Sequence, residues 1–485
     1  MKQFNFYNHL GFHNPYYIFE DGQLIIESDF ENILSKTRED KVLDFTSLVE
    51  VFSTGFCFGD RTLIKGINKT PWMAKPNSGL NNWDFFEVPT HAENHLPKIE
   101  IVKTFYSLLE EELLTYITPY KRIGILLTGG MDSRIVACVL NNLKLDGRLE
   151  DKQVFAFTWG LENSRDVVYA RNIAKLFNWD WTHLMVDETQ MIENCNIAIE
   201  NGCEFTPIHL HAMSQVSLHE NIDCVLAGSF GDSVGRAEFS GRNVQELKSL
   251  EGKIGNIGGL LRDDFLGLAL DDIKSDLKHY HELFPQKFLY QQFEQDQQLH
   301  YMRRMLNSCM NIINKKVPLF QMFSSPLVFG FMWSLDPKIR DNSIYFELLK
   351  NYGPELLEIP WARTGIKYNS LEGNPDNYLK KHHDYGKMIR TNFLEYVEDS
   401  IESNINLADK IFDVKTCRSL INNLRNYPIN GGIVFEDRVL YIGQVLNFLN
   451  KYNVEVKLPK VKSSLLKNLK DDLYYKGKFL YKKLK

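Results

Sequence analysis

The fold of this chain is indicated most strongly by residues 123–133, which read Ile123-Gly124-Ile125-Leu126-Leu127-Thr128-Gly129-Gly130-Met131-Asp132-Ser133. The first five residues have the pattern of a buried strand, and a helix is predicted directly after the two glycines, over about residues 132–143. Glycines let the backbone approach an anion closely, and the N–H groups of the loop and the helix start would point at it. The stretch therefore predicts a phosphate-binding loop at the carboxyl end of a parallel strand, where open α/β sheets bind ligands.

The side chains of this loop fit the same chemistry. Thr128 and Ser133 add hydroxyl donors for an anion. The carboxylate of Asp132 repels an anion, so its natural role there is to hold Mg²⁺ against phosphate oxygens. The alternative is a glycine-rich turn capped by an aspartate, without a ligand.

Strands and helices alternate on both sides of this loop. Further strands are predicted over 154–159, 182–186 and 223–227, and helical stretches over about 98–118, 164–177 and 206–219. Such alternation predicts parallel βαβ units with right-handed crossovers. Beyond Gly241 the pattern is mostly helical.

The first 90 residues are predicted to be rich in β-structure. Apolar runs at 16–19 and 24–26 flank Glu20-Asp21-Gly22 and indicate a hairpin, followed by a short helix over 45–53 and a strand-like segment over 60–67. A cluster of Pro, Asn and Gly within 70–96 marks a domain boundary. We therefore expect a small domain over residues 1–95, a large domain over 96–455 and a tail over 456–485.

Composition narrows the classes of protein. The 485 residues are 44% hydrophobic and 24% charged, which is an ordinary globular balance. The net charge of −6 disfavours general nucleic-acid binding. The seven cysteines form no CxxC pair, so neither a disulfide framework nor a zinc knuckle is indicated. With no apolar signal core and no run long enough for a membrane span, we expect a cytoplasmic protein, and the length favours an enzyme.

The C-terminal tail differs in charge from the rest of the chain. Residues 456–485 carry ten Lys and two Asp, so this segment is basic while the preceding residues are acidic. Leucines at helical spacing between the lysines predict an amphipathic helix. Its lysine face is either simply solvated or contacts an anionic membrane surface or an acidic partner.

Three segments resemble one family of enzymes. The loop Thr128–Ser133 resembles the SGGxDS loop of the N-type ATP pyrophosphatases. Phe157-Thr158-Trp159-Gly160, followed by Asp166, is similar to the second strand and helix of the asparagine synthetase domain, and residues 225–232 resemble its VLSGxGxDE turn. The resemblance spans roughly residues 98–370, including residues 317–320 in place of its ERxPFLD segment.

The resemblance implies an α/β fold: a parallel-sheet ATP pyrophosphatase domain of the adenine nucleotide alpha hydrolase type with a helical C-terminal part. It implies a ligase that uses ATP and Mg²⁺ to adenylate a small-molecule or peptide carboxylate. An amide would then form with ammonia or an amine, with release of AMP and pyrophosphate. The implied site residues are Thr128, Gly129, Gly130, Asp132 and Ser133 for pyrophosphate, Leu127, Trp159 and Gly228 for the nucleoside, and Asp132 and Asp232 for the metal.

Residues 42–79 are similar to the closing portion of the family's N-terminal glutaminase domain, an Ntn-hydrolase fold. In that domain the nucleophile is the Cys exposed when Met1 is removed, whereas position 2 of this chain is Lys2. The N-terminal region is also about half the usual length. We therefore expect a truncated, non-catalytic domain and no glutaminase activity.

The chain departs from the family at several substrate-pocket positions. Acidic positions of the family correspond here to Ser229, Ser233, Asn314 and Gln321. The family's catalytic lysine falls near Gly365, so Lys367 or Arg363 would have to supply the cation, unless both are ordinary surface charges.

Three alternatives remain open at this point. The first is a catalytically silent nucleotide-binding or scaffold relative. The second is another reaction on the same loop, such as nucleobase thiolation, against which the lack of a CxxC pair argues. Finally, His209 and His211 are either metal ligands or a polar pair in the core, and the absence of an evident third ligand favours the pair.

Overall fold

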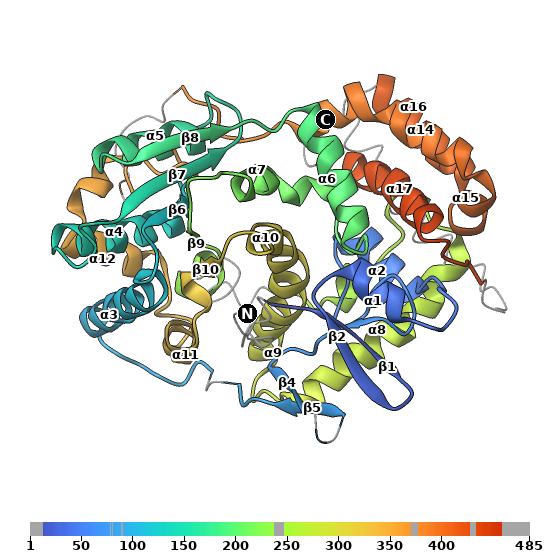
Figure 1. Ribbon diagram of the computed structural model, residues 1–485, viewed down its shortest axis with the longest axis horizontal. Coiled ribbons are helices and arrows are strands. Elements are labelled where there is room, and N and C mark those ends of the chain that lie inside the picture. Colours follow the sequence, from blue (N-terminus) through green and yellow to red (C-terminus); the bar gives the residue numbers. More distant parts are fainter. Residues whose placement is uncertain are drawn as a thin grey trace.

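The computed structural model describes residues 13–77, 79, 81–88, 91–236, 247–368, 370, 377–426 and 433–457. Its centre is a five-stranded parallel sheet in the order β10-β9-β6-β7-β8 (Figure 1). The strands are β6 (Arg122–Leu126), β7 (Gln153–Trp159), β8 (Asp180–Leu184), β9 (Cys224–Ala227) and β10 (Leu319–Gln321). The chain builds outward from β6 to β8 and then returns to place β9 on the other side of β6. The carboxyl ends of β6 and β9 therefore form a topological switch point.

Both faces of the sheet are buried because apolar residues continue through each strand. Ile123, Ile125 and Leu226 point to one face, while Leu126 and Val225 point to the other, as the two-residue period of a strand requires. The first face packs against α3 (Lys98–Ile117), α4 (Met131–Leu145), α5 (Arg165–Leu176), α11 (Pro326–Ser334) and α12 (Asn342–Tyr352). The second packs against α6 (Glu188–Glu200), α7 (Met213–Ser217) and α10 (Ser308–Asn314). This three-layer arrangement confirms the predicted α/β fold class.

The N-terminal region contains a small antiparallel sheet. The hairpin of β1 (Tyr16–Glu20) and β2 (Gln23–Glu27) pairs through β1 with the short β3 (Asn68–Lys69). Two helices, α1 (Phe30–Lys36) and α2 (Phe45–Thr54), and a second hairpin, β4 (Ala74–Asn77) with β5 (Asn82–Phe85), complete it. Helix α2 begins at Asp44, whose side chain accepts a hydrogen bond from the N–H of Ser47, and ends at Gly55 with φ 99°.

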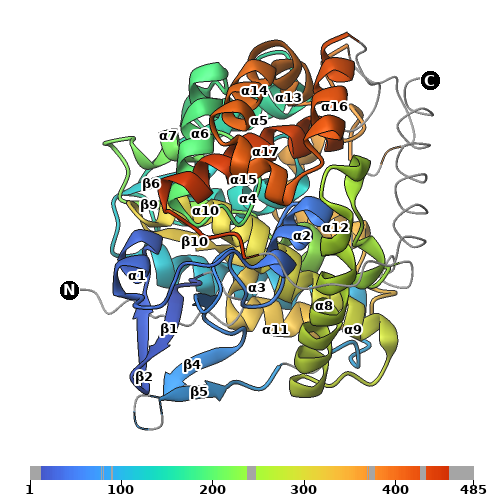
Figure 2. The ribbon, with the colours of Figure 1, turned by 90° about the vertical axis from the view of Figure 1, so that its right-hand side faces the viewer.

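The C-terminal helices complete the hydrophobic core of the N-terminal region. Phe52 of α2 packs on Phe412 with ring centroids 5.4 Å apart, and the Nε of Arg438 donates to the Phe52 carbonyl at 2.5 Å. Figure 2 shows the C-terminal helices, coloured orange to red, stacked against the blue N-terminal elements. The helices of this part are α8 (Asp263–Leu283), α13 (Tyr385–Met388), α14 (Leu394–Ser403), α15 (Ile405–Ile411), α16 (Val414–Asn426) and α17 (Val434–Lys451). The two ends of the chain thus share one core, and the expected division at residue 95 stays a sequence-based prediction.

Several shorter helical turns connect these elements. The 3₁₀ turns are η1 (Pro207–Leu210), η4 (Glu251–Lys253), η5 (Ile257–Gly259), η7 (Met322–Ser324) and η8 (Pro354–Glu358). The turns η2 (Gly231–Gly235), η6 (Gln297–Asn307) and η9 (Ile389–Phe393) are π-helical. Helix α9 (Leu289–Asp296), η6 and α10 follow one another without a break and form one continuous helical segment.

A buried charged group lies on α9. Glu294 has no exposed surface and accepts hydrogen bonds from Arg340 at 2.7 and 3.0 Å, and its other neighbour is His91 at 2.5 Å. Burial by itself raises the pKa of Glu294, but Arg340 and His91 outweigh it and lower the pKa to about 2. The carboxylate is therefore charged at neutral pH, and it links α9 to the segment that precedes α12.

The structure corrects two local predictions. The segment over 60–67 is not a strand, because the Thr62 hydroxyl bonds the carbonyls of Ile64 and Ile67 and closes it into turns. The predicted helix over 206–219 is divided into η1 and α7, since His211 adopts φ 46° between them. The predicted tail helix lies outside the described residues, and no helix among those described is long and apolar enough to cross a membrane.

Candidate functional site

The loop between β6 and α4 is shaped by its own hydroxyl groups. The N–H of Gly130 donates to the Thr128 hydroxyl at 3.0 Å, and the N–H of Thr128 donates to the Ser133 hydroxyl at 3.1 Å. Gly130 is the N-cap of α4, and it supplies no side-chain cap for the first helical turn. The positive end of this 15-residue helix therefore faces the loop with amide groups suited to an anion.

Glycines allow three backbone segments to meet at this point. A Cβ on Gly129 would lie 2.9 Å from both the Ala362 Cβ and the Arg165 carbonyl oxygen. A Cβ on Gly228 would lie 2.7 Å from the Ser133 nitrogen, and one on Gly231 would lie 2.6 Å from the Asp132 Cβ. The loop after β6 and the turn after β9 are therefore in direct contact. This contact places Asp132 against the turn that carries Asp232.

A buried arginine that sequence reasoning missed fixes the position of the loop. Arg134 donates to the Gly129 carbonyl at 3.2 Å and to the carbonyls of Leu356, Ile359 and Pro360 at 2.7–2.9 Å. Burial lowers the pKa of Arg134 to about 9, so the guanidinium is still charged at neutral pH. Three of these carbonyls come from the segment before Trp361. Arg134 therefore connects that segment to the loop Thr128–Ser133 by hydrogen bonds.

A second missed residue, Arg236, pairs with Asp132. Its Nε lies 2.8 Å from one carboxylate oxygen and its Nη2 lies 3.0 Å from the other, which is a bidentate arrangement. Arg236 is 5% exposed and the Asp132 side chain is 22% exposed. Burial alone lowers the pKa of Arg236, but the negative charges of Asp132 and Asp232 raise it above its ordinary value. Asp132 thus already has a permanent cation on both of its oxygens.

The turn after β9 carries the second predicted metal ligand. Asp232 is half-buried in η2, which begins directly after Phe230, a residue with φ 71°. The buried Ser233 hydroxyl donates to the Phe230 carbonyl at 3.3 Å, and the Tyr345 hydroxyl donates to the Gly231 carbonyl at 3.0 Å. Ser233 therefore stabilises the turn in place of the acid found in the family. Its neighbour Ser229 is half-buried in the same turn.

The two predicted metal ligands lie close to the same arginine. Asp132 and Asp232 both act electrostatically on Arg236, so the two carboxylates share one environment. Carboxylate oxygens suit Mg²⁺, although Arg236 competes with a metal ion for the Asp132 carboxylate. The two carboxylates are donors of the kind that magnesium prefers.

Trp159 lies at the carboxyl end of β7, next to β6, and Leu127 is fully buried at the start of the loop. The Trp159 ring is stacked on His211, with centroids 5.7 Å apart and planes 17° apart. His211 in turn contacts the Tyr385 hydroxyl through Nδ1 at 2.8 Å. Burial and the neighbouring histidines hold the pKa of His211 well below its ordinary value, so it is neutral. Trp159 presents a partly exposed aromatic surface beside the loop.

The histidine pair does not sit on a strand. His209 belongs to η1 and His211 follows it at a positive φ. Among the described residues there is no group of three His, Cys, Asp or Glu side chains that could hold a metal ion. The interpretation of His209 and His211 as a polar pair agrees with this finding.

A third residue missed as a site member is Asp166, in the first turn of α5. Its carboxylate accepts a hydrogen bond from the Gly129 N–H. Burial raises the pKa of Asp166, while nearby His382 and this hydrogen bond oppose the rise. Asp166 thereby ties α5 to the loop. An acidic residue in the first turn of a predicted helix was the available sequence signal.

The two predicted catalytic cations lie in different surroundings. The Lys367 side chain is 55% exposed and its amine is paired with Glu358 at the surface. Arg363 is also exposed, but its guanidinium carbon lies 5.1 Å from the centre of the Trp361 ring. The guanidinium carbon of Arg236 lies 5.6 Å from the centre of the same ring. Arg363 and the ion pair of Arg236 with Asp132 are therefore both neighbours of Trp361. The structure therefore places Arg363 beside Trp361 at the site, whereas Lys367 forms an exposed ion pair with Glu358.

The position expected for the family's lysine is filled from another element. Gly365 has φ 75°, and a Cβ there would lie 2.4 Å from the Arg165 guanidinium carbon. Arg165 comes from the first turn of α5 and is largely buried. A cation from α5 therefore occupies the space beside Gly365.

Of the two remaining positions at which the family has an acid, Gln321 and Asn314, one lies near the site and the other does not. Gln321 ends β10 beside Ala227 of β9, and its amide donates to the Asn307 Oδ1 at 2.9 Å. Asn314 instead lies 3.1 Å from the His13 ring of the N-terminal region and accepts from the Leu319 N–H at 3.0 Å. Gln321 thus borders the carboxyl ends of the strands, whereas Asn314 belongs to the contact between the N-terminal region and α10.

Comparison with known proteins finds one matching family model. Residues 114–303 match the family model described as asparagine synthase, which covers less than half of the chain. No curated protein matches the sequence. Among solved structures, the chain is similar to the U34-tRNA thiolase NcsA of Methanococcus maripaludis with its [4Fe-4S] cluster, at 12% identity and a TM-score of 0.26, over 76% of this chain and 93% of that one. It is also similar to NAD+ synthetase from Burkholderia pseudomallei, at 11% identity and a TM-score of 0.21, over 55% and 91%.

The two structural scores are too low to carry an argument about the site. The family match stands on different evidence, because it includes the loop Thr128–Ser133 and the turn Gly228–Asp232, which the structure brings into contact. The sheet order and the placement of these two turns at its switch point agree with that match. Residues 114–303 of this chain are therefore similar to the asparagine synthase family.

Proposed function

We propose that this protein is an ATP-dependent ligase that adenylates a carboxylate and then forms an amide with ammonia or an amine. One observation carries the proposal: the Thr128–Ser133 loop, with the positive end of α4 behind it, lies against the Gly228–Asp232 turn at the switch point of the sheet. The match of residues 114–303 to the asparagine synthase family supports the use of ATP.

In this proposal the triphosphate lies on the loop Thr128–Ser133 and the amides of the first turn of α4. Leu127, Trp159 and Gly228 border the nucleoside. An oxygen of the carboxylate attacks the α-phosphorus, the bond to the β-phosphate oxygen breaks, and pyrophosphate leaves. The nitrogen of ammonia or an amine then attacks the acyl carbon, loses a proton, and AMP leaves with the carboxylate oxygen.

Positive charge near the departing pyrophosphate is required, because two phosphates carry the negative charge that develops. Arg236 and Arg165 are two largely buried cations beside the loop, in addition to Arg134, whose donors are taken up by backbone carbonyls, and Arg363 lies next to Trp361. We assign the charge-stabilising role to these arginines in place of the family's lysine. Lys367 has no part in this assignment, since its amine is paired with Glu358 at the surface.

Magnesium would accompany ATP, and Asp132 and Asp232 are the carboxylates that would hold it. The ion supplies charge neutralisation of the phosphate oxygens when bound. Arg236 would then exchange one Asp132 oxygen for a phosphate oxygen. In the absence of the metal, the Arg236 guanidinium compensates the negative charge of Asp132.

The test is product analysis with ATP, ammonia and a panel of carboxylic acids. We expect pyrophosphate and AMP in equal amounts with the correct acid, and a loss of at least about 100-fold for Asp132→Asn, as for removal of a group that binds the transferring phosphates. Asp146→Asn is the matched control, because Asp146 caps the other end of α4 and is 59% exposed. Formation of ADP and phosphate would contradict the proposal.

A second candidate is a nucleotide-binding relative without catalysis. It is favoured by the pairing of Asp132 with Arg236 and by the surface position of Lys367. This candidate predicts ATP binding that depends on the loop, together with no pyrophosphate release for any acid or amine. Measuring ATP binding and product formation on the same samples separates the two candidates.

A further inference from the structure

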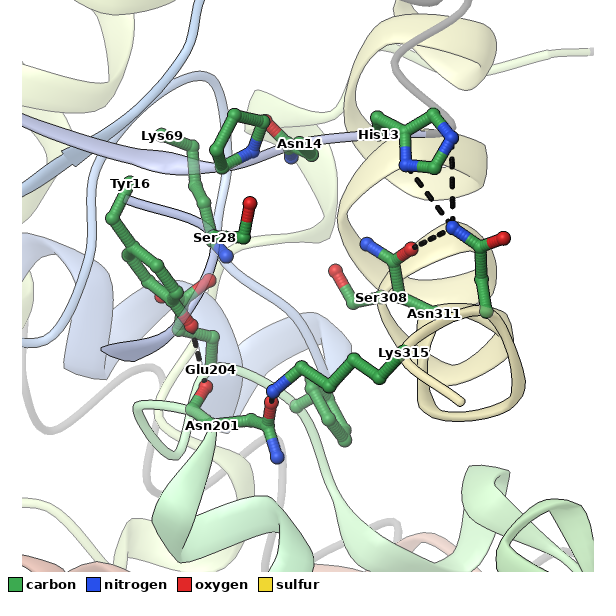
Figure 3. Close-up of a pocket in the computed structure, with 13 residues that line it drawn as sticks. His13, Asn14, Tyr16, Ser28, Lys69, Asn201, Glu204, Ser308, Asn311 and Lys315 are labelled. Carbon is green, nitrogen blue, oxygen red and sulfur yellow. Dashed lines mark hydrogen bonds between the residues drawn. The ribbon is translucent and has the colours of Figure 1, made fainter. Parts of the chain in front are cut away.

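A separate cavity, lined by both polar and apolar atoms, lies between the N-terminal sheet and the helical segment that ends in α10. Figure 3 shows this cavity, which has a volume of about 150 Å³. Its walls come from β1, β3, the end of α6 and α10. It is lined mainly by His13, Asn14, Tyr16, Lys69, Glu204, Ser308 and Lys315. None of these residues belongs to the candidate nucleotide site.

Lys69 is the central feature of the cavity. The residue is 7% exposed, and its amine lies 3.2 Å from the centre of the Tyr16 ring. Figure 3 shows this amine directed into the cavity. Within the part of the chain that the structure describes, no hydrogen-bond acceptor or carboxylate contacts it. The Tyr16 ring attracts the cation, but a largely buried amine without a hydrogen-bond acceptor is costly, so Lys69 is poised for an acceptor that the protein does not supply.

The other charges around the cavity are already paired. Glu204 accepts from Arg304 at 2.7 Å. Lys315 donates to the Asn201 Oδ1 at 2.5 Å and lies 3.6 Å from an oxygen of Asp29. When Lys69 is protonated, the cavity therefore carries a net positive charge. The ligand that balances this charge is an anion.

Two further donors point to the same class of ligand. The Asn14 amide nitrogen and the Ser308 hydroxyl are buried, and neither has a hydrogen-bond partner among the described residues. Asn14 is held in place because its Oδ1 accepts from the Arg303 guanidinium at 3.4 Å. An oxyanion satisfies an amide donor, a hydroxyl donor and an ammonium group together.

We propose that this cavity binds a small carboxylate anion, held by Lys69, Asn14 and Ser308. A space of about 150 Å³ accommodates a molecule of about six non-hydrogen atoms, the size of benzene. The unpartnered Oε1 of Glu204 adds one acceptor, which a hydroxyl group next to the carboxylate can satisfy. A 2-hydroxy acid of the size of lactate therefore matches the cavity in charge, volume and hydrogen bonding. The inference does not depend on the reaction proposed above.

Binding is expected to depend on pH in a defined direction. Burial, together with the charges of Arg304, Lys315 and Arg303, lowers the pKa of Lys69 to about 7, while Glu204 opposes the shift. An anion stabilises the charged amine, so binding near the pKa is accompanied by proton uptake. Since only about 1% of the lysine is charged two pH units above its pKa, affinity is expected to fall about 50-fold from pH 7 to pH 9.

The experiment is calorimetric titration of the full chain with lactate and with alanine, which have the same number of non-hydrogen atoms. We expect lactate to bind more tightly than alanine, with proton uptake at about pH 7 and the loss at higher pH stated above. Lys69→Met should weaken lactate binding at least tenfold. The control Lys65→Met, at an exposed lysine near β3, should leave it unchanged.

Three results would overturn the assignment. They are lactate binding that Lys69→Met leaves intact, alanine binding as tight as lactate binding, and no lactate binding at all. If Lys69→Met fails to fold, Ser308→Ala serves as the second variant, for which we expect at least a threefold loss of lactate affinity. An unchanged affinity in that variant would equally count against the assignment.

Discussion

The pairing of Arg236 with Asp132 leads to a prediction about magnesium that requires no knowledge of the substrate. Replacing the arginine, as in Arg236→Gln, removes the cation from a carboxylate that is 22% exposed. Breaking a fully buried pair costs about 3–5 kcal/mol, but water reaches this carboxylate and reduces the penalty. We therefore expect the free energy of unfolding to fall by about 2 kcal/mol.

Magnesium should restore part of this stability in the variant. With Asp132 and Asp232 no longer compensated, the pair becomes a better site for a divalent cation, and magnesium at ten times its dissociation constant adds about 1.4 kcal/mol. In the unaltered protein Arg236 competes for Asp132, so the gain should be below about 0.3 kcal/mol. The measurement is urea unfolding with and without magnesium chloride, at ionic strength matched with sodium chloride.

A matched control is available on the same sheet. Arg122 also makes two contacts with one carboxylate, donating to Asp223 from Nε at 3.1 Å and from Nη2 at 2.7 Å, but at the amino ends of β6 and β9. Arg122→Gln should lose little stability, because the arginine side chain is 40% exposed, and it should not respond to magnesium. Equal stabilisation of the unaltered protein and Arg236→Gln by magnesium would refute the competition between Arg236 and the metal.

Three further predictions follow from individual contacts. Gly129→Ala places a methyl group 2.9 Å from two neighbours, so fluorescence titration should show ATP affinity reduced at least tenfold and unfolding should cost about 1–3 kcal/mol less. Arg363→Met should lower the kcat/KM for pyrophosphate release about tenfold, whereas Lys367→Met should change it less than twofold; the reverse order would remove Arg363 from the site. The folded-state pKa of Glu294 lies below its ordinary value, so its contribution to stability is complete above about pH 4.5 and is lost as the pH falls toward about 2. Glu294→Gln should therefore lack this pH dependence in thermal unfolding and, with Arg340 left buried, should be about 3–5 kcal/mol less stable at neutral pH.

The central strands could be predicted because their physical pattern is local. β6, β7 and β9 are apolar on both faces and each ends at a glycine or a turn, which indicates parallel strands under helices on both sides. β10 was not predicted as a strand, because it has only three residues and is defined by pairing with β9, far away in the sequence. The error over 60–67 has a similar cause, since Thr62 makes hydrogen bonds that an apolar pattern does not reveal.

In the site, too, the features that depend on local sequence could be predicted, whereas the contacts between residues far apart in the chain could not. The loop Thr128–Ser133 and the turn with Asp232 are each visible in the sequence as glycine-rich ends of strands. The pairing of Asp132 with Arg236 is not visible in the sequence, because the two residues are 104 positions apart. They come together in the fold, where the turn at Gly231 contacts Asp132. The Arg165 guanidinium fills the space beside Gly365, which no spacing rule anticipates.

The central claim is that a carboxylate oxygen attacks the α-phosphorus of ATP. It is tested most directly with a carboxylic acid labelled with ¹⁸O in its carboxyl group, followed by mass spectrometry of the nucleotide product. The account predicts AMP that carries one ¹⁸O atom per molecule of amide formed, and loss of this product in Asp132→Asn. Unlabelled AMP, or ADP with the label in inorganic phosphate, would contradict it.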